Sequence, residues 1–121
     1  MQTLQDKTAI VTGGTRGIGY SIAQALLREG AKVFICGRKG ADVKQSVAAL
    51  AASGSPDSVD GREADVQRYE DCRRLVRAAA DRFGGLDILV NNAGIGIFNP
   101  IDRLKPEDWD ATIGTNLSGI F

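Results

Sequence analysis

The glycine-rich stretch TGGTRGIG at residues 12–19 is the feature that most constrains how this chain can fold. It follows a short apolar run, TAIV at residues 8–11, and precedes a segment with helical spacing at residues 18–29. Glycine allows backbone angles that a side chain disfavours, and the N–H groups that open a helix point at an anion. A glycine-rich turn between a strand and a helix therefore predicts a phosphate-binding loop at the start of a βαβ unit.

Each of the four glycines of this turn has its own predicted structural role. Gly13 and Gly14 allow the tight backbone, Gly17 lets a phosphate approach the main chain, and Gly19 lets the helix pack closely on the sheet.

The turn has two other possible interpretations. Residues 14–21 fit the phosphate-binding loop of nucleoside triphosphatases except that Tyr20 stands where that loop requires a lysine. A tight turn that binds nothing is the remaining alternative.

The rest of the chain alternates between strand-like and helix-like segments. The predicted strands are 8–11, 32–36, 59–66 and 86–90, and the predicted helices are 18–29, 42–52, 67–83 and a last one that begins at Pro106. Strands separated by helices of this length imply right-handed crossovers and a parallel sheet. We therefore expect an α/β fold with a parallel sheet. In the first helix, Ile22, Ala25 and Leu26 are expected to form the buried stripe.

Composition narrows the possible functions. The chain has 121 residues, 43% of them hydrophobic, which suits one folded domain spanning residues 1–121. Fifteen basic and fifteen acidic residues balance, so no charge excess predicts a nucleic-acid or membrane partner. The absence of histidine removes the commonest zinc ligand, and no metal site is expected. Cys36 and Cys72 are expected to be buried free thiols. A polar N-terminus and the lack of a membrane-length apolar run predict a cytoplasmic protein.

The end of the second predicted strand indicates which dinucleotide is preferred. An acidic residue there typically binds the ribose hydroxyls of NAD, but this chain reads CGRKG at residues 36–40. Arg38 and Lys39 follow the strand, and Arg16 lies in the glycine turn. Guanidinium groups without a carboxylate favour a 2′-phosphate, so NADP(H) is the expected cofactor. The alternative is that Arg38 and Lys39 are solvated charges at a strand end.

Three further motifs point to a family. ADV at residues 64–66, NNAG at 91–94 and TNLSGIF at 115–121 follow the third strand, the fourth strand and the last helix start. Together with the glycine spacing, they make the whole chain resemble the N-terminal half of the short-chain dehydrogenase/reductase family. The resemblance implies the N-terminal half of a Rossmann-type doubly wound parallel sheet, with strand order 3-2-1-4. The resemblance looks closest to bacterial 3-oxoacyl-acyl-carrier-protein reductases and similar NADP-dependent ketone reductases.

The resemblance implies a role for each matched position. Residues 13–18 would hold the pyrophosphate and adjoining ribose, and Asp65 would hydrogen-bond the adenine amino group beside the backbone of Val66. Residues 91–94 would pack beside the adenosine and brace the sheet, and Asn116 would be the catalytic asparagine that shapes a helix kink and holds a water. The predicted cofactor-binding residues are Gly13, Gly14, Thr15, Arg16, Gly17, Ile18, Gly19, Arg38, Lys39, Asp65, Val66, Asn92, Ala93 and Gly94.

Each of these roles has a purely structural alternative. Asp65 could cap the helix that follows it, residues 91–94 could be only a turn at the sheet's end, and Asn116 could be a surface polar residue.

The family's catalytic serine and Tyr-x-x-x-Lys motif have no match in this chain. Tyr20 is followed four places on by Gln24, and Tyr69 by Arg73. Two positions also depart from the family's pattern, Gln67 at a helix start and Gly114 two places before Asn116.

We therefore expect a domain that is incomplete at its C-terminus, either because the protein is truncated or because the sequence is part of a longer enzyme. The parent function would be NADP-dependent hydride transfer to or from a small carbonyl or alcohol substrate, in a homo-oligomer when full length. The alternative is a non-catalytic dinucleotide-binding module, or a fragment that needs a complementary chain.

Overall fold

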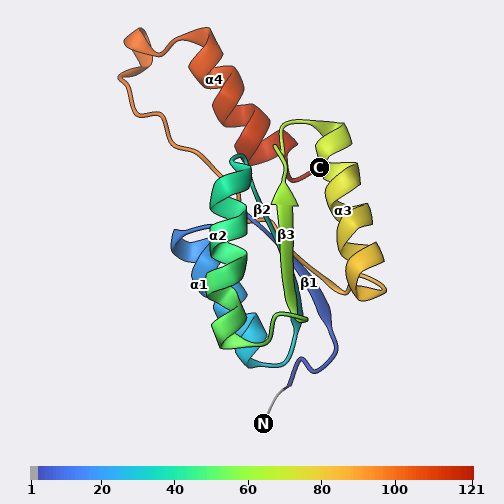
Figure 1. Cartoon of the computed structure of the whole chain (residues 1–121). Helices are drawn as coiled ribbons and strands as arrows, with labels where there is room; N and C mark the ends of the chain where they lie inside the picture. The colour runs from blue at the N-terminus through green and yellow to red at the C-terminus, as the bar shows by residue number, and fades with distance from the viewer. Residues whose placement is uncertain (1–2) are drawn as a thin grey trace.

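The computed structural model describes residues 3–121 and contains a four-stranded parallel sheet with helices on both faces (Figure 1). The strands are β1 (Thr8–Thr12), β2 (Lys32–Gly37), β3 (Val59–Glu63) and β4 (Ile88–Val90). They lie in the order β3-β2-β1-β4, and every pairing is parallel. The predicted α/β class and the strand order 3-2-1-4 are confirmed.

The helices alternate with the strands as expected. They are α1 (Gly17–Arg28), α2 (Gly40–Leu50), α3 (Tyr69–Phe83) and α4 (Pro106–Ile113), with short 3₁₀ turns at Ala51–Ser53 and Ile101–Arg103 and a π-helical turn at Gly114–Ser118. In Figure 1, α1 and α2 cover one face of the sheet and α3 covers the other.

Two predicted boundaries near Asp65 were too generous. β3 ends at Glu63 rather than at residue 66, and α3 begins at Tyr69 rather than at residue 67. The reason is a turn between them, because Asp65 accepts the Gln67 N–H on its carboxylate and the Arg68 N–H on its carbonyl.

The predicted buried stripe of α1 was wrong by a small rotation. The helix buries Gly19, Ala23 and Leu27, while Ala25 is exposed and Ile22 and Leu26 are only partly buried. A Cβ built at Gly19 would collide with the Gly13 carbonyl oxygen and the Asn92 side-chain amide. This close approach of the glycine sets the rotation of the helix on the sheet.

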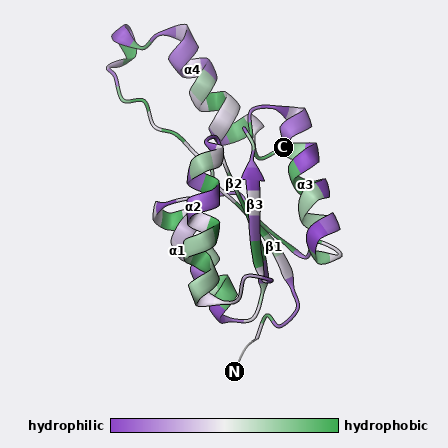
Figure 2. Cartoon of the chain, viewed as in Figure 1, coloured by the Kyte–Doolittle hydropathy of each residue, from purple (hydrophilic) through white to green (hydrophobic). Residues whose placement is uncertain are grey.

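The core has one cluster on each face of the sheet, as alternating side chains of a strand require. Val11, Val33 and Ile35 pack with α1 and α2, whereas Ile10 and Phe34 pack with α3. The edge strand β3 differs from these inner strands, because its upper half is hydrophilic (Figure 2). Charged residues on an edge strand disfavour pairing with another chain.

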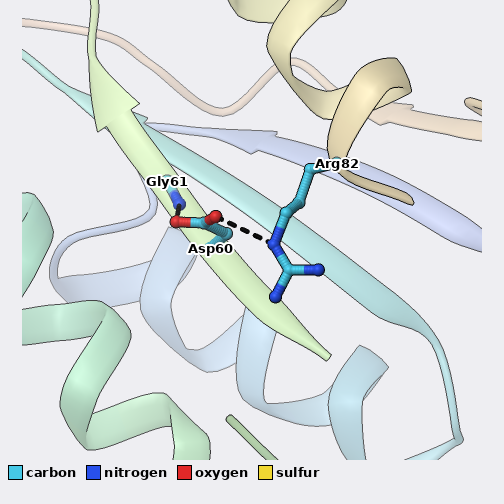
Figure 3. A network of polar contacts seen from close by, with 3 residues as sticks. All are labelled: Asp60, Gly61 and Arg82. Carbon is cyan, nitrogen blue, oxygen red and sulfur yellow. Dashed lines mark hydrogen bonds and ion pairs between the residues drawn. The ribbon is translucent and has the colours of Figure 1, made fainter. Parts of the chain in front are cut away.

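An ion pair ties α3 to the edge strand β3. Arg82 Nε donates to Asp60 Oδ2 over 3.1 Å, and Asp60 Oδ1 accepts the Gly61 N–H over 2.8 Å (Figure 3). Both charged side chains are about 40% exposed, at 39% and 42%, so solvent screens the pair and its contribution to stability is small.

Beyond β4, the chain leaves the sheet. Residues 91–100 form neither helix nor strand, and α4 projects away from the sheet edge (Figure 1). This projecting arm, residues 95–113, carries exposed apolar side chains at Ile97, Phe98, Ile101 and Trp109. Within residues 3–121, no helix has the length and apolar character needed to cross a membrane.

Candidate functional site: the carboxyl edge of the sheet

The glycine-rich turn is pressed against the end of β2. Gly13 has a positive φ of 64°, and the Gly14 N–H donates to the Cys36 carbonyl over 3.2 Å. A Cβ at Gly14 would lie 2.6 Å from Ile35 Cγ2, too close for any other residue without a shift of β2. Glycine is thus favoured at position 13 by backbone conformation and at position 14 by packing.

Gly17 and the start of α1 leave room for an anion. Gly17 has a φ of 59°, and a Cβ built there meets no heavy atom within 4 Å. No side chain caps the N-terminus of α1, and its first turn contains no acidic residue. Backbone N–H groups and the positive end of the helix dipole therefore face open space, which fits the pyrophosphate of a dinucleotide.

Asn92 and Thr12 fasten the segment after β4 to the glycine turn. Asn92 Nδ2 donates to the carbonyl oxygens of Thr12 and Gly13, each over 3.1 Å. Thr12 Oγ1 accepts the N–H groups of Asn92 and Ala93 over 3.1 and 3.0 Å. These bonds brace the top of β1 against the end of β4. Thr12 was not among the predicted site residues, although it begins the glycine motif.

Asp65 lies in the turn between β3 and α3 and is partly buried. Its N–H donates to Asp71 Oδ2 over 2.9 Å, and its Oδ1 accepts the Gln67 N–H over 3.0 Å. The carboxylate therefore caps the turn before α3 rather than the first turn of the helix. Within residues 3–121, Oδ2 of Asp65 has no hydrogen-bond partner and can accept a bond from a ligand.

The three predicted phosphate-binding cations are exposed at the same edge. Arg16 precedes α1, and Arg38 and Lys39 link β2 to α2. A Cβ built at Gly37 would lie 2.8 Å from Thr15 Cγ2, so the turn and the end of β2 lie side by side. The ion pairs among residues 3–121 involve other arginines, Arg73 and Arg82, which leaves these three charges for a ligand.

Asn116 lies in the π-helical turn and holds the segment after β4. Its Oδ1 accepts the Ile95 N–H and its Nδ2 donates to the Ile95 carbonyl, both over 2.8 Å. The turn itself is closed by the Gly119 N–H to the Gly114 carbonyl over 2.9 Å. Asn116 is exposed, but its side-chain oxygen and nitrogen both form hydrogen bonds with the Ile95 backbone. A surface residue whose side chain is solvated would form neither bond.

The two departures from the family's pattern meet in space. A Cβ built at Gly114 would lie 2.7 Å from Gln67 Oε1, so the Gln67 side chain occupies the space above the glycine. A Cβ at Gly119 would lie 2.8 Å from Val66 Cγ2. The turn that follows β3 thus packs directly on the turn that carries Asn116. Gln67 and Gly114 were each visible in the sequence, but their contact was not.

Neither cysteine has the features of a reactive group. Cys36 is 1% exposed, and burial raises the pKa of its thiol to about 11. Cys72 is only partly buried, which corrects the expectation of a buried thiol, and its pKa is also raised by burial and by Asp71. Among residues 3–121, no group of three His, Cys, Asp or Glu side chains could hold a metal ion.

A hollow of about 830 Å³ lies along α3, away from the glycine turn. Arginines 62, 73, 74 and 77 and Phe121 line it, and the Phe121 ring stacks on Tyr69 with 6.4 Å between centroids. None of the predicted site residues lines this hollow.

Comparisons with known proteins agree with this geometry. Residues 7–121 match the model of a family described as short chain dehydrogenase. The chain is 42% identical over 118 residues to D-beta-hydroxybutyrate dehydrogenase from Cupriavidus necator, covering 98% of this chain and 45% of the relative.

Two solved structures are similar in fold. One is 3-ketoacyl-(acyl-carrier-protein) reductase from Brucella melitensis complexed with NADH, with a TM-score of 0.90, 34% identity, and coverage of 98% of this chain and 48% of that chain. The other is actinorhodin polyketide ketoreductase with NADPH, with a TM-score of 0.91, 38% identity, and coverage of 100% and 46%. The chain spans about half the length of the proteins it matches.

Proposed function

Because the chain belongs to the short-chain dehydrogenase/reductase family, we propose that it is the cofactor-binding part of an NADP-dependent oxidoreductase. The enzyme would transfer hydride between NADP(H) and a small carbonyl or alcohol substrate. The observation that carries the proposal is the open, uncapped N-terminus of α1 above which Gly17 leaves space for a pyrophosphate.

In this proposal, different residues at the carboxyl edge of the sheet bind different parts of the cofactor. Residues 13–18 hold the pyrophosphate and the adjoining ribose, with the pyrophosphate at the backbone N–H groups that open α1, and the free Oδ2 of Asp65 accepts a hydrogen bond from the adenine amino group. Residues 92–94 form the wall beside the adenosine, held there by the bonds from Asn92 to β1. The nicotinamide ring, when bound, supplies or accepts the hydride. Asn116 positions a water near it through the turn that it stabilises.

The choice of NADP(H) over NAD(H) rests on this chain's own side chains. The two solved relatives carry different dinucleotides, NADH in one and NADPH in the other, so family membership alone leaves both open. Arg38 and Lys39 stand where an NAD-binding domain places a carboxylate, Arg16 lies in the adjoining glycine turn, and none of the three forms an ion pair within residues 3–121. A doubly charged phosphate satisfies these groups, whereas ribose hydroxyls do not.

Titration of the 121-residue chain with NADPH and NADH, followed by nucleotide fluorescence, tests the proposal. Charge-assisted hydrogen bonds of about 1.5–3 kcal/mol predict that NADPH binds roughly tenfold to hundredfold more tightly. Equal dissociation constants would overturn the NADP assignment and leave the family's fold intact. No measurable binding of either nucleotide would overturn the cofactor-binding function itself.

A further inference from the structure

Ser46 is a buried polar residue of α2 whose hydroxyl reaches across to the glycine-rich turn. The residue is 8% exposed, and its Oγ donates to the Thr15 carbonyl oxygen over 2.7 Å. A serine within a helix usually returns its hydroxyl to a carbonyl of the same helix or to solvent. Here the bond joins two segments 31 residues apart in the sequence.

This bond fixes more than one atom, because a peptide group is planar. The Thr15 carbonyl and the Arg16 N–H belong to the same peptide, which is trans, as are all the peptide bonds of the structure. Holding the carbonyl toward α2 therefore turns the Arg16 N–H away from α2. The same plane fixes the position of the Arg16 Cα, the atom from which the side chain leaves the main chain.

Thr15 is also held from a second side. Its Cγ2 lies against Gly37, where a Cβ would come within 2.8 Å, and Gly37 is the residue before Arg38. Thr15 is thus held by one hydrogen bond from α2 and by one packing contact with the end of β2, next to the residues that precede Arg16 and Arg38 in the fold.

A hollow beside the glycine turn leaves Arg16 room to move if the turn is not held. A hollow of about 390 Å³ between α1 and α2 is lined by Arg16, Ser46, Tyr20 and Asp42. The Asp42 carboxylate offers the Arg16 guanidinium a partner other than a ligand. Because Arg16 already lines this hollow, a turn that was free to rotate would let its guanidinium settle toward Asp42 rather than toward a ligand.

We propose that Ser46 is a positioning residue that holds Arg16 in place for the 2′-phosphate and so sharpens the preference for NADP(H) over NAD(H). This inference rests on the proposed function. Ser46 touches no cofactor atom in this account and acts through the peptide between Thr15 and Arg16.

The test compares Ser46→Ala with a matched control, Ser58→Ala. Ser58 also donates its hydroxyl to a backbone carbonyl, that of Ser55, over 2.9 Å, but at the opposite end of the strands. Alanine is the most favourable helix residue, so Ser46→Ala keeps α2 intact. Losing one buried hydrogen bond predicts a roughly threefold to tenfold weaker binding of NADPH, with NADH binding changed less than about twofold. Ser58→Ala should change neither.

Equal weakening of both nucleotides, or no weakening, would overturn the positioning role, because a general loss of structure does not discriminate between them. A second measurement needs no cofactor: trypsin cleavage after Arg16, followed by mass spectrometry of the products. Ser46→Ala should be cut there several times faster than the parent chain and Ser58→Ala. An unchanged rate overturns the inference even if NADPH binds. Failure of the parent chain to bind nucleotide overturns the proposed function and the role in NADP(H) preference, whereas faster cleavage of Ser46→Ala would still show that Ser46 holds Arg16 in place.

Discussion

At the scale of single residues, Arg38 is the side chain on which the proposed preference for NADP(H) depends most. It follows β2 directly, is exposed, and has no acidic partner within residues 3–121. A carboxylate at this position would bind ribose hydroxyls and repel a 2′-phosphate.

Arg38→Asp should therefore reverse the preference, lowering NADPH affinity by roughly tenfold or more and raising NADH affinity. Arg74→Asp is the matched control, since it makes the same charge change on the exposed face of α3, beside a different hollow. Competition titrations with both nucleotides on all three proteins give the measurement. A variant that still prefers NADPH would show that Arg16 and Lys39 alone select the phosphate.

The residues of the candidate site could be predicted from the sequence where they belong to short local motifs. The glycines, Arg38 and Asp65 stand within short motifs at strand ends, so position and chemistry are visible together. Contacts across long sequence separations were not readable. Ser46 looks like any helical serine, and the bonds between Thr12 and Asn92 span 80 residues.

At the scale of elements, the alternation of strands and helices followed from the hydrophobic pattern, and the strand order followed from the motifs that identify the fold. The rotation of α1 and the ends of β3 and α3 could not be predicted in either way. Apolar residues of α1 occur on nearly every side, so periodicity left its buried face open. The close contact of Gly19 with the turn decided it. The ends of β3 and α3 were set by the hydrogen bonds of Asp65, a side chain that the pattern treats only as polar.

Gly19→Ala tests this packing of α1 on the sheet. The added methyl would collide with the Gly13 carbonyl oxygen and the Asn92 amide, so α1 must shift. Overpacking of this kind costs about 1–3 kcal/mol of unfolding free energy. Gly85→Ala is the control because a Cβ there meets nothing within 4 Å and the residue has no positive φ. Chemical denaturation of both variants provides the comparison, and equal stability would contradict the proposed contact.

At the scale of the whole molecule, the distribution of apolar surface governs behaviour in solution. β4 is an edge strand with Leu89 half exposed, and Phe98 and Phe121 are each 94% exposed. Contiguous apolar surface and an open strand edge both promote association.

We therefore expect the 121-residue chain to self-associate at micromolar concentration and to be marginally stable. Replacing Phe98 and Ile101 with serine should reduce the oligomer fraction seen by light scattering, because both lie on the projecting arm. Replacing the exposed polar residues Asn99 and Asp102 with serine serves as the control. A monomeric parent chain with a sharp, cooperative melt would count against this prediction.

Catalysis depends on whether residues 1–121 contain a suitable proton donor. Reducing a ketone requires a proton donor at the developing alkoxide, and such a group typically contributes about 10²–10⁴-fold to the rate. The chain contains no histidine, and neither Tyr20 nor Tyr69 has a lysine four places on. Asn116 can hold a water through its turn, but an amide does not donate its proton at neutral pH.

The 121-residue chain should thus bind NADPH without oxidising it, in an absorbance assay with a panel of ketones and 3-oxoacyl thioesters. Supplying the second half found in relatives, in one longer chain or as a separate polypeptide, should restore turnover. In that assembly, Asn116→Ala should weaken turnover because it releases the Ile95 peptide and the π-helical turn together. Asn99→Ala, on the exposed arm, should not. Steady turnover by the purified chain alone, abolished by a substitution within it, would place the catalytic groups among residues 1–121 and refute the assignment of the proton donor elsewhere.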